Sequence, residues 1–230
     1  MKSMRTYIFF TSLFIFFISL GQEKTKDTIR FSDFSLRLGT DISKLVKTSL
    51  IKEYNGFEVN ADFKFSKKYY LAGEFGRENR TIDETQLNFT TQGSYFKLGI
   101  DYNTYENWLN MNNAIFVGLR YGLSSYSTKL NNYSVLNPDP YWLENEFVTT
   151  PIEYENSTTQ FIELLIGIKA EIFNNLYLGV NVQLKKYIND KVPDNFENLY
   201  IPGFGKTTDD SKWGVGFGYT ISYLIPFHKN

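Results

Sequence analysis

Large apolar residues alternate with very small or polar residues along the segment from Trp213 to Phe227. Because successive side chains of a β-strand point to opposite faces, this alternation predicts a strand with one apolar and one polar face. The polar face is mostly glycine, which suits a crowded interior better than open solvent. This combination is typical of a small transmembrane β-barrel, in which the apolar face meets lipid. The apolar face carries Trp213, Val215, Phe217, Tyr219, Ile221, Tyr223 and Ile225.

The same alternation recurs in seven earlier segments. Their apolar faces carry no charged residue, and a lysine or arginine that faces the lipid midplane costs roughly 2–4 kcal/mol. The pattern therefore predicts an all-β fold, an eight-stranded antiparallel up-and-down transmembrane β-barrel. The seven earlier strands are expected near Phe34–Leu45, Gly56–Phe65, Tyr69–Arg77, Ser94–Asn103, Ala114–Ser124, Gln160–Phe173 and Leu176–Tyr187.

Short and long connections alternate between these strands. The short ones are predicted at 66–68, 103–113 and 174–175, the last of which consists of two asparagines that tolerate the positive φ of a tight hairpin. Short turns on one side of the membrane and long loops on the other are the outer-membrane topology, which places both termini in the periplasm and the long loops outside the cell. Long loops are predicted at 46–55, 78–93, 125–159 and 186–212.

The N-terminus indicates export. Lys2 and Arg5 precede an apolar run at 7–20, which has the length of a signal-peptide core. We expect residues 1–21 to be a cleaved signal peptide and residues 22–230 to form the barrel domain in the cell outer membrane. An uncleaved helical anchor is the alternative, but it needs roughly 20 apolar residues. The chain contains no cysteine, so no lipid anchor is expected.

A soluble, secreted barrel of the lipocalin type is the alternative fold, since it also has eight antiparallel strands. In such a barrel the large apolar residues fill the interior and the charged face meets water. The glycine-rich face of the last strand and the aromatic residues near strand ends favour the membrane barrel, because they match a tight lumen and an interfacial girdle. The girdle candidates are Tyr69, Tyr102, Tyr187 and Trp213.

Charged residues on the predicted inner faces are nearly balanced. An eight-stranded interior is just wide enough for side chains to fill, so opposite charges there are expected to pair into a salt-bridged plug. A plugged lumen leaves a structural or surface-recognition role, and a narrow channel for small polar solutes is the alternative. The inner faces carry Arg37, Lys64, Lys97, Arg120, Lys169 and Lys185 against Asp41, Glu58, Asp62, Glu74, Asp101, Glu163 and Glu171.

A lipid-modifying outer-membrane enzyme is the third class of function. Such an enzyme needs a nucleophile or base at the outer rim, whereas the only histidine, His228, is expected on the periplasmic side. We therefore expect no enzyme, and no catalytic, cofactor-binding or metal-binding residues, since cysteine is absent and no calcium-loop motif is present. The acidic residues Glu144, Glu146, Glu153 and Glu155 fit a solvated loop.

Two predicted loops carry aromatic residues among polar ones. They lie at 133–154, with Tyr141, Trp142 and Phe147, and at 193–205, with Phe196, Tyr200 and Phe204. Exposed aromatic residues on a rigid scaffold suit recognition of an extracellular protein or glycan, and the alternative is that they fold down and cap the barrel mouth.

Composition agrees with one exported domain that does not bind nucleic acid. A length of 230 residues suits a single β-barrel domain. The formal net charge of −1 becomes about −3 when Lys2 and Arg5 are removed with the signal peptide, which gives no electrostatic case for a nucleic-acid partner.

Five segments carry a resemblance to known sequences: Tyr105–Trp108, Val117–Gly122, Phe173–Gly179, Asn195–Phe204 and Gly218–Pro226. They resemble an uncharacterised family of outer-membrane β-barrels from the Bacteroidota, a domain of unknown function, over nearly the whole mature chain. The architecture is more distantly similar to the OmpA-type eight-stranded barrel. This resemblance implies outer-membrane lipid as the surroundings and insertion by the barrel-assembly machinery, and it supplies no catalytic residue.

Overall fold

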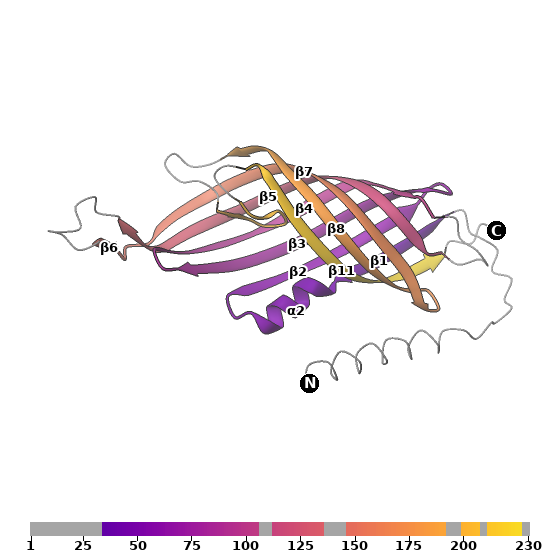
Figure 1. The fold of residues 1–230 in the computed structure, drawn as a ribbon, viewed down its shortest axis with the longest axis horizontal. Helices are drawn as coiled ribbons and strands as arrows, with labels where there is room; N and C mark the ends of the chain where they lie inside the picture. Colours follow the sequence, from indigo (N-terminus) through magenta and orange to yellow (C-terminus); the bar gives the residue numbers. More distant parts are fainter. Residues whose placement is uncertain (1–33, 106–111, 136–145, 192–198, 208–210, 227–230) are drawn as a thin grey trace, which may run out of the picture.

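The computed structural model describes residues 34–105, 112–135, 146–191, 199–207 and 211–226. Eight long antiparallel strands form one sheet in the order β4-β3-β2-β1-β11-β8-β7-β5, and β5 also pairs with β4, so the sheet closes into a ring (Figure 1). The prediction of an all-β fold with eight antiparallel strands is confirmed. The long strands are β1 (Ser35–Asp41), β2 (Tyr54–Lys64), β3 (Tyr69–Glu84), β4 (Leu87–Asn103), β5 (Ala114–Val135), β7 (Ile152–Phe173), β8 (Leu176–Lys191) and β11 (Trp213–Pro226).

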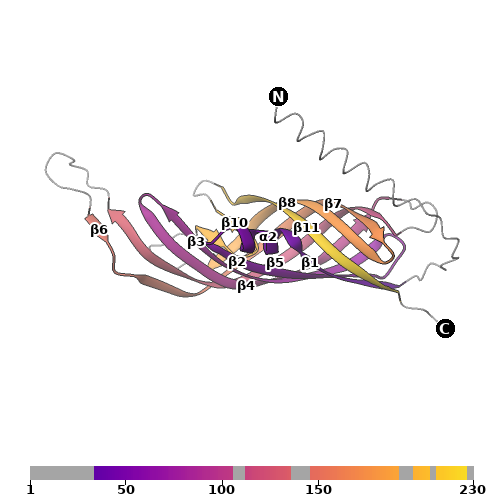
Figure 2. The ribbon, with the colours of Figure 1, turned by 90° about the horizontal axis from the view of Figure 1, so that it is seen from below.

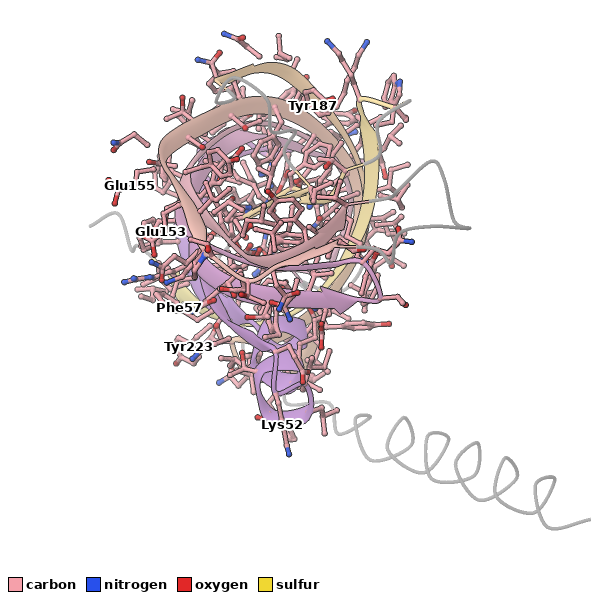
Figure 3. The ribbon with its side chains drawn as sticks, turned by 90° about the vertical axis from the view of Figure 1, so that its left-hand side faces the viewer. Lys52, Phe57, Glu153, Glu155, Tyr187 and Tyr223 are labelled. Carbon is pink, nitrogen blue, oxygen red and sulfur yellow. The ribbon has the colours of Figure 1, made fainter. Side chains whose placement is uncertain are left out.

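The inner and outer faces of the ring carry the residues that the alternation predicts for them. Along β5, every second residue from Ala114 to Leu130 is buried and faces the interior, while the residues between them face outward. A view along the ring shows side chains filling the space inside it (Figure 3). Large apolar residues lie on the outside, where Ile166 is 58% exposed and Val182 is 60% exposed. This arrangement is the reverse of the one that a lipocalin-type barrel requires.

The ring has two unlike ends. At the first, which we call the turn end, strands are joined by short turns such as the predicted Asn174–Asn175 hairpin, in which Asn175 has a φ of 62°. At the second, which we call the loop end, lie β6 (Glu146–Val148) and a small hairpin of β9 (Tyr200–Ile201) and β10 (Gly205–Lys206) (Figure 2).

Two of the predicted long loops are largely β-structure. The segment 78–93 belongs to β3 and β4, which meet at a two-residue turn, and β5 and β7 both extend into the predicted loop 125–159. These loop predictions were wrong because the outward positions here are polar or charged, so the alternation of apolar and polar residues fades. Polar contacts hold these parts of the strands together instead, as in the 3.1 Å hydrogen bond between the hydroxyls of Thr91 and Thr128.

The first predicted strand is also corrected, because β1 ends at Asp41 and a helix, α2 (Ile42–Leu50), replaces the rest of that strand and much of the predicted loop 46–55. The Asp41 carboxylate caps the helix by accepting a 2.7 Å hydrogen bond from the Ser43 backbone N–H. A continued strand would have placed Lys44 on the apolar outer face, whereas the helix turns it inward. α2 lies between β2 and β11 (Figure 1). None of the helices among the described residues has the length and apolar character needed to cross a membrane.

Glycines on the inner faces let large side chains lie flat against the backbone. The ring of Tyr95 packs on Gly76 of β3 and on Gly203 of the β9–β10 hairpin, where a φ of +78° favours glycine. A Cβ atom at Gly76 would collide with the Tyr95 ring. Gly73, on the opposite face of the same strand, has no such neighbour, since the nearest atom to its Cβ position is 3.9 Å away.

Replacing Gly76 with alanine is expected to destabilise the fold by about 1–3 kcal/mol, because the Tyr95 ring has to leave its place between two glycines. Gly73→Ala is the matched control, with an expected change within about 0.5 kcal/mol. Urea unfolding of both variants, followed by tryptophan fluorescence, measures the difference. Equal unfolding midpoints would show that the packing of Tyr95 does not depend on Gly76.

Candidate functional site

The interior is crossed by a continuous series of ion pairs, which we call the charge belt. Its residues come from every long strand except β11. In order, the pairs are Arg37–Asp62 at 2.6 Å, Asp62–Lys169 at 2.6 Å, Lys169–Asp101 at 3.8 Å, Asp101–Arg120 at 2.7 Å, Arg120–Glu74 at 3.2 Å, Glu74–Lys97 at 3.0 Å, Lys97–Glu163 at 3.0 Å and Glu163–Lys185 at 3.7 Å.

Cations and carboxylates alternate at every step of the charge belt. The alternation matters because a buried charge costs several kcal/mol unless an opposite charge and hydrogen bonds compensate it. Lys97 illustrates the arrangement, since its side chain is 2% exposed and its ammonium lies 3.0 Å from both Glu74 on β3 and Glu163 on β7. The belt thus links strands on different sides of the ring through its interior.

The hairpin Tyr200–Lys206, which we call the inserted hairpin, enters the ring at the loop end. Its Ile201 and Phe204 are buried against inward-facing aromatic residues of β5 and β7. The Lys185 ammonium donates a 2.8 Å hydrogen bond to the Gly203 carbonyl oxygen. Of the two alternatives for the predicted loop 193–205, the described part therefore caps the mouth of the ring.

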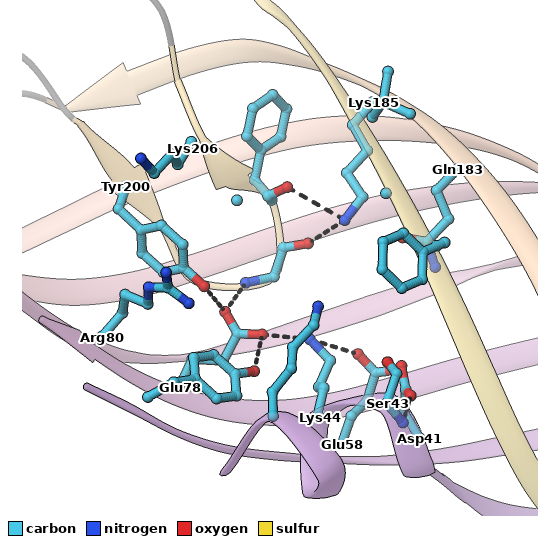
Figure 4. A pocket seen from close by; sticks show the side chains of 18 of the residues that line it. Asp41, Ser43, Lys44, Glu58, Glu78, Arg80, Gln183, Lys185, Tyr200 and Lys206 are labelled. Carbon is cyan, nitrogen blue, oxygen red and sulfur yellow. Dashed lines mark hydrogen bonds and ion pairs between the residues drawn. The ribbon is translucent and has the colours of Figure 1, made fainter. Parts of the chain in front are cut away.

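A second group of charges, which we call the helix cluster, joins α2 to the inserted hairpin (Figure 4). Lys44 forms ion pairs with Glu78 and, at 3.6 Å, with Glu58. Glu78 accepts hydrogen bonds from the Tyr200 hydroxyl at 2.8 Å and from the Gly203 N–H at 3.1 Å. Burial and the nearby Glu78 charge raise the pKa of the Tyr200 hydroxyl well above its usual value, so it stays a donor. One carboxylate therefore connects helix and hairpin.

Two interior cavities differ sharply in size. The larger, of about 280 Å³, lies between α2, the inserted hairpin and β11. The smaller, of about 30 Å³, lies among residues of the charge belt such as Asp62, Glu74 and Arg120. A space of that size holds about one or two water molecules. The described side chains of the belt thus fill nearly all of the cross-section around them.

The charged residues predicted for the inner faces do lie on the inner face of the sheet, but several of them are not part of the charge belt. Asp41 caps α2, and Glu58 pairs with Lys44. Glu171 accepts a 3.0 Å hydrogen bond from the Tyr177 hydroxyl near the turn end. Lys64 is buried with 8% exposure.

Sequence reasoning missed two residues of the helix cluster, Lys44 and Glu78. The signal for Lys44 was the helical spacing of apolar residues at 42, 45, 46 and 50 directly after a capping aspartate. The signal for Glu78 was its place two residues beyond Gly76, on the inner face of a strand that does not stop there.

Several predicted features lie outside the described residues: the signal peptide 1–21, Tyr141, Trp142, Glu144, Phe196 and His228. The side chains of Glu146 and Phe147 are not described either, while Glu153 and Glu155 lie on β7. In the part of the chain that the structure describes, no group of three or more Asp, Glu, His or Cys residues is placed to hold a metal ion.

Replacing Lys97 with methionine removes a cation from the middle of the belt while keeping an unbranched side chain that is one atom shorter. Among the described residues, Glu163 then retains only Lys185 as an ion-pair partner, at 3.7 Å, so we expect a loss of about 3–5 kcal/mol in folding stability. The double variant Lys97→Met/Glu163→Gln is expected to recover part of that loss, because it also removes the carboxylate that lost its partner. Urea midpoints compare the three proteins, and an unchanged midpoint for Lys97→Met would show that the belt contributes nothing to stability.

Comparison with known proteins gives one match. No curated protein and no solved structure matches this chain. A family model described as a domain of unknown function matches residues 2–230, which is almost the whole chain and agrees with the resemblance to an uncharacterised domain. The chain therefore belongs to the DUF6048 family.

Proposed function

We propose that the protein is an outer-membrane β-barrel with a closed interior, which serves as a structural or surface-recognition protein at its loop end. The observation that carries this proposal is the band of large apolar side chains around the outside of a ring whose inside is charged. A soluble protein rarely exposes a continuous apolar surface of this extent, and a lipid-facing band explains it directly.

The apolar band ends at one level on the loop-end side. Phe75, Phe96 and Leu123 face one another across β3, β4 and β5, and they belong to the band. One step further along the same face, the cross-strand partners are Arg77, Ser94 and Ser125. An abrupt change from apolar to polar residues at the same height on adjacent strands is expected where hydrocarbon gives way to headgroups and water.

Aromatic residues border the band at the turn end. Tyr69 lies 5.2 Å from Tyr102 and 6.3 Å from Phe65, measured between ring centroids. Toward the loop end, the Lys186 ammonium lies over the Trp213 ring at 5.0 Å, and both residues face outward. Aromatic residues and lysines at the two edges of an apolar band match membrane interfaces, and they support the girdle predicted for Tyr69, Tyr102 and Trp213. The fourth girdle candidate, Tyr187, was wrong, because its ring packs inside the ring of strands against Phe204.

The filled interior supports a closed barrel over the alternative of a narrow channel. A solute crossing the ring has to pass the charge belt, in which about 30 Å³ is open, and then the inserted hairpin. Opening that path breaks ion pairs between buried side chains, which is costly. Residues 1–21 as an export signal and insertion by the barrel-assembly machinery complete the proposal.

The loop end supplies the surface for recognition. β3, β4, β5 and β7 continue beyond the apolar band. Ile82, Phe89 and Leu130 of their projecting part form a small core with Tyr200 of the inserted hairpin. A rigid scaffold that presents polar strand faces and loops outside the membrane suits binding of a protein or glycan. Catalysis is not part of the proposal.

Planar-bilayer conductance tests the closed interior. We expect the protein, purified from outer membranes, to show no steady current, because the charge belt fills the cross-section. The double variant Lys97→Ala/Arg120→Ala removes two belt cations and much side-chain volume, so it is expected to show a measurable current. Lys129→Ala, at an exposed ion pair, is the control and is expected to stay silent. Reproducible channels in the native protein would make transport the leading function.

A further inference from the structure

The wall of the ring is not made of strands everywhere. β1 pairs with β2 as far as Thr40 and with β11 as far as Asp41, and it ends there. The segments 54–58 of β2 and 213–219 of β11 continue toward the loop end, paired with β3 and β8 respectively but not with each other. Helix α2 occupies the gap between them (Figure 1).

α2 forms hydrogen bonds and an ion pair with only one side of this gap. On the β2 side, the Thr48 hydroxyl accepts a 2.8 Å hydrogen bond from the Gly56 N–H and donates one of 3.0 Å to the Gly56 carbonyl, and Lys44 pairs with Glu58. On the β11 side, the Lys47 ammonium lies 4.9 Å from the centre of the Phe217 ring. Within the described chain, the structure shows no hydrogen bond between α2 and β11. The boundary between α2 and β11, which we call the seam, is therefore the weakest part of the wall.

The 280 Å³ cavity lies directly behind the seam, because its lining includes α2, the inserted hairpin and the segment 215–217 of β11 (Figure 4). Its charged lining is mostly cationic. The lining cations are Lys44, Lys47, Arg80, Lys97, Lys185 and Lys206, against Asp41, Glu58 and Glu78.

The cavity's carboxylates are already engaged, whereas two of its six cations form no ion pair within the described part of the chain. Glu58 and Glu78 share Lys44. Among the described residues, no carboxylate lies within ion-pair distance of Lys47 or Arg80. The Arg80 guanidinium lies over the Tyr54 ring at 5.7 Å, and its Nε is buried with no hydrogen-bond acceptor in the part of the chain that the structure describes. A cavity lined by such cations suits an anion with several acceptor oxygens, such as a phosphate group.

The outside of the seam is apolar. α2 turns Leu45, Val46 and Leu50 outward, and β11 adds Val215 and Phe217, of which Val215 is 77% exposed. A path across the seam thus leads from an apolar surface to a cationic cavity within the thickness of one helix. This polarity matches an amphiphile whose acyl chains stay outside while its charged group enters.

We propose that the cavity binds the phosphate headgroup of a membrane lipid, which enters sideways through the seam between α2 and β11. The proposal rests on the membrane location given above. The lipid's acyl chains lie along the outer faces of α2 and β11, and its phosphate contacts Lys47 and Arg80. Access from the bilayer requires only that α2 and β11 separate, and no ion pair of the charge belt has to break.

Native mass spectrometry of the protein purified from outer membranes tests the proposal, with dioleoyl phosphatidic acid and dioleoyl phosphatidylcholine as probes. We expect one retained phosphatidic acid per chain and no retained phosphatidylcholine. Lys47→Gln/Arg80→Gln is expected to lower retention at least tenfold. The control Lys52→Gln/Lys129→Gln makes the same charge change outside the cavity and is expected to retain the lipid fully.

A second variant narrows the cavity without changing its charge. Gly216 faces the cavity, and a Cβ there lies 2.7 Å from the Gln183 amide oxygen and 3.1 Å from the Lys185 Cε, both near the ends of flexible side chains. Gly216→Val is therefore expected to fold, as judged by heat-modifiable electrophoretic mobility, and to lose phosphatidic acid. Gly73→Val, outside the cavity, is its control.

Three results would overturn the proposal. The first is equal lipid retention by the native protein and by both cavity variants. The second is a folded, membrane-derived native protein that retains no phosphatidic acid, which leaves the proposed barrel intact. The third is binding of inorganic phosphate in place of the lipid, since that result assigns the cavity to a free anion. Absence of the protein from the outer-membrane fraction refutes the proposed function first, and the lipid site with it.

Discussion

The structure depends on the compensation of charge inside a closed ring of strands. Apolar residues occupy one face of each strand, so closing the sheet with that face outward sends the charged residues of all strands into one narrow space. Such charges are tolerated only if each meets an opposite partner. The charge belt from Arg37 to Lys185 meets this requirement with alternating partners across the ring. Because the apolar faces point outward, ion pairs close the interior. These ion pairs determine which routes through the molecule stay open.

The short first strand is the main departure from a uniform wall. Because β1 ends at Asp41, edges of β2 and β11 are left without a strand partner, and the backbone groups of those edges need other neighbours. Thr40 and Thr48 satisfy part of the β2 edge through hydrogen bonds to Glu58 and Gly56. The β11 edge receives only side-chain packing from α2 in the described chain. The asymmetry of this gap explains why a cavity of about 280 Å³ lies behind it.

Much of the ring could be predicted from sequence, because its apolar parts alternate with a period of two. The eight strands, the Asn174–Asn175 turn and the inward placement of residues such as Lys97 and Arg120 all follow from that period. At Arg77 and beyond, the outward residues become polar and no longer alternate with apolar residues. The sequence therefore predicted loops where the structure has strands. The pairing of particular charges could not be predicted, since it depends on the register of strands far apart in sequence.

The helix and the inserted hairpin show a different limit. α2 has helical spacing of its apolar residues, but it follows a strand without a break, so the strand pattern masked it. The inserted hairpin fits into the ring because Gly203 lies against the Tyr95 ring and Gly214 leaves space for the Phe204 ring. A sequence shows aromatic residues in a loop, and only the folded ring shows whether they bind a partner or fill its mouth.

The most direct measurement of the membrane location is the labelling of two single cysteines on the outer face of β4. The chain has no cysteine of its own, so Leu98→Cys inside the apolar band and Gln92→Cys beyond it can be compared without background. These positions lie on one face of one strand, about 20 Å apart. If the band faces lipid, a membrane-impermeant maleimide applied to intact outer membranes labels Gln92→Cys and spares Leu98→Cys until the protein is unfolded. Equally fast labelling of both cysteines in the folded protein would mean that the band faces water, and the membrane barrel would have to be abandoned.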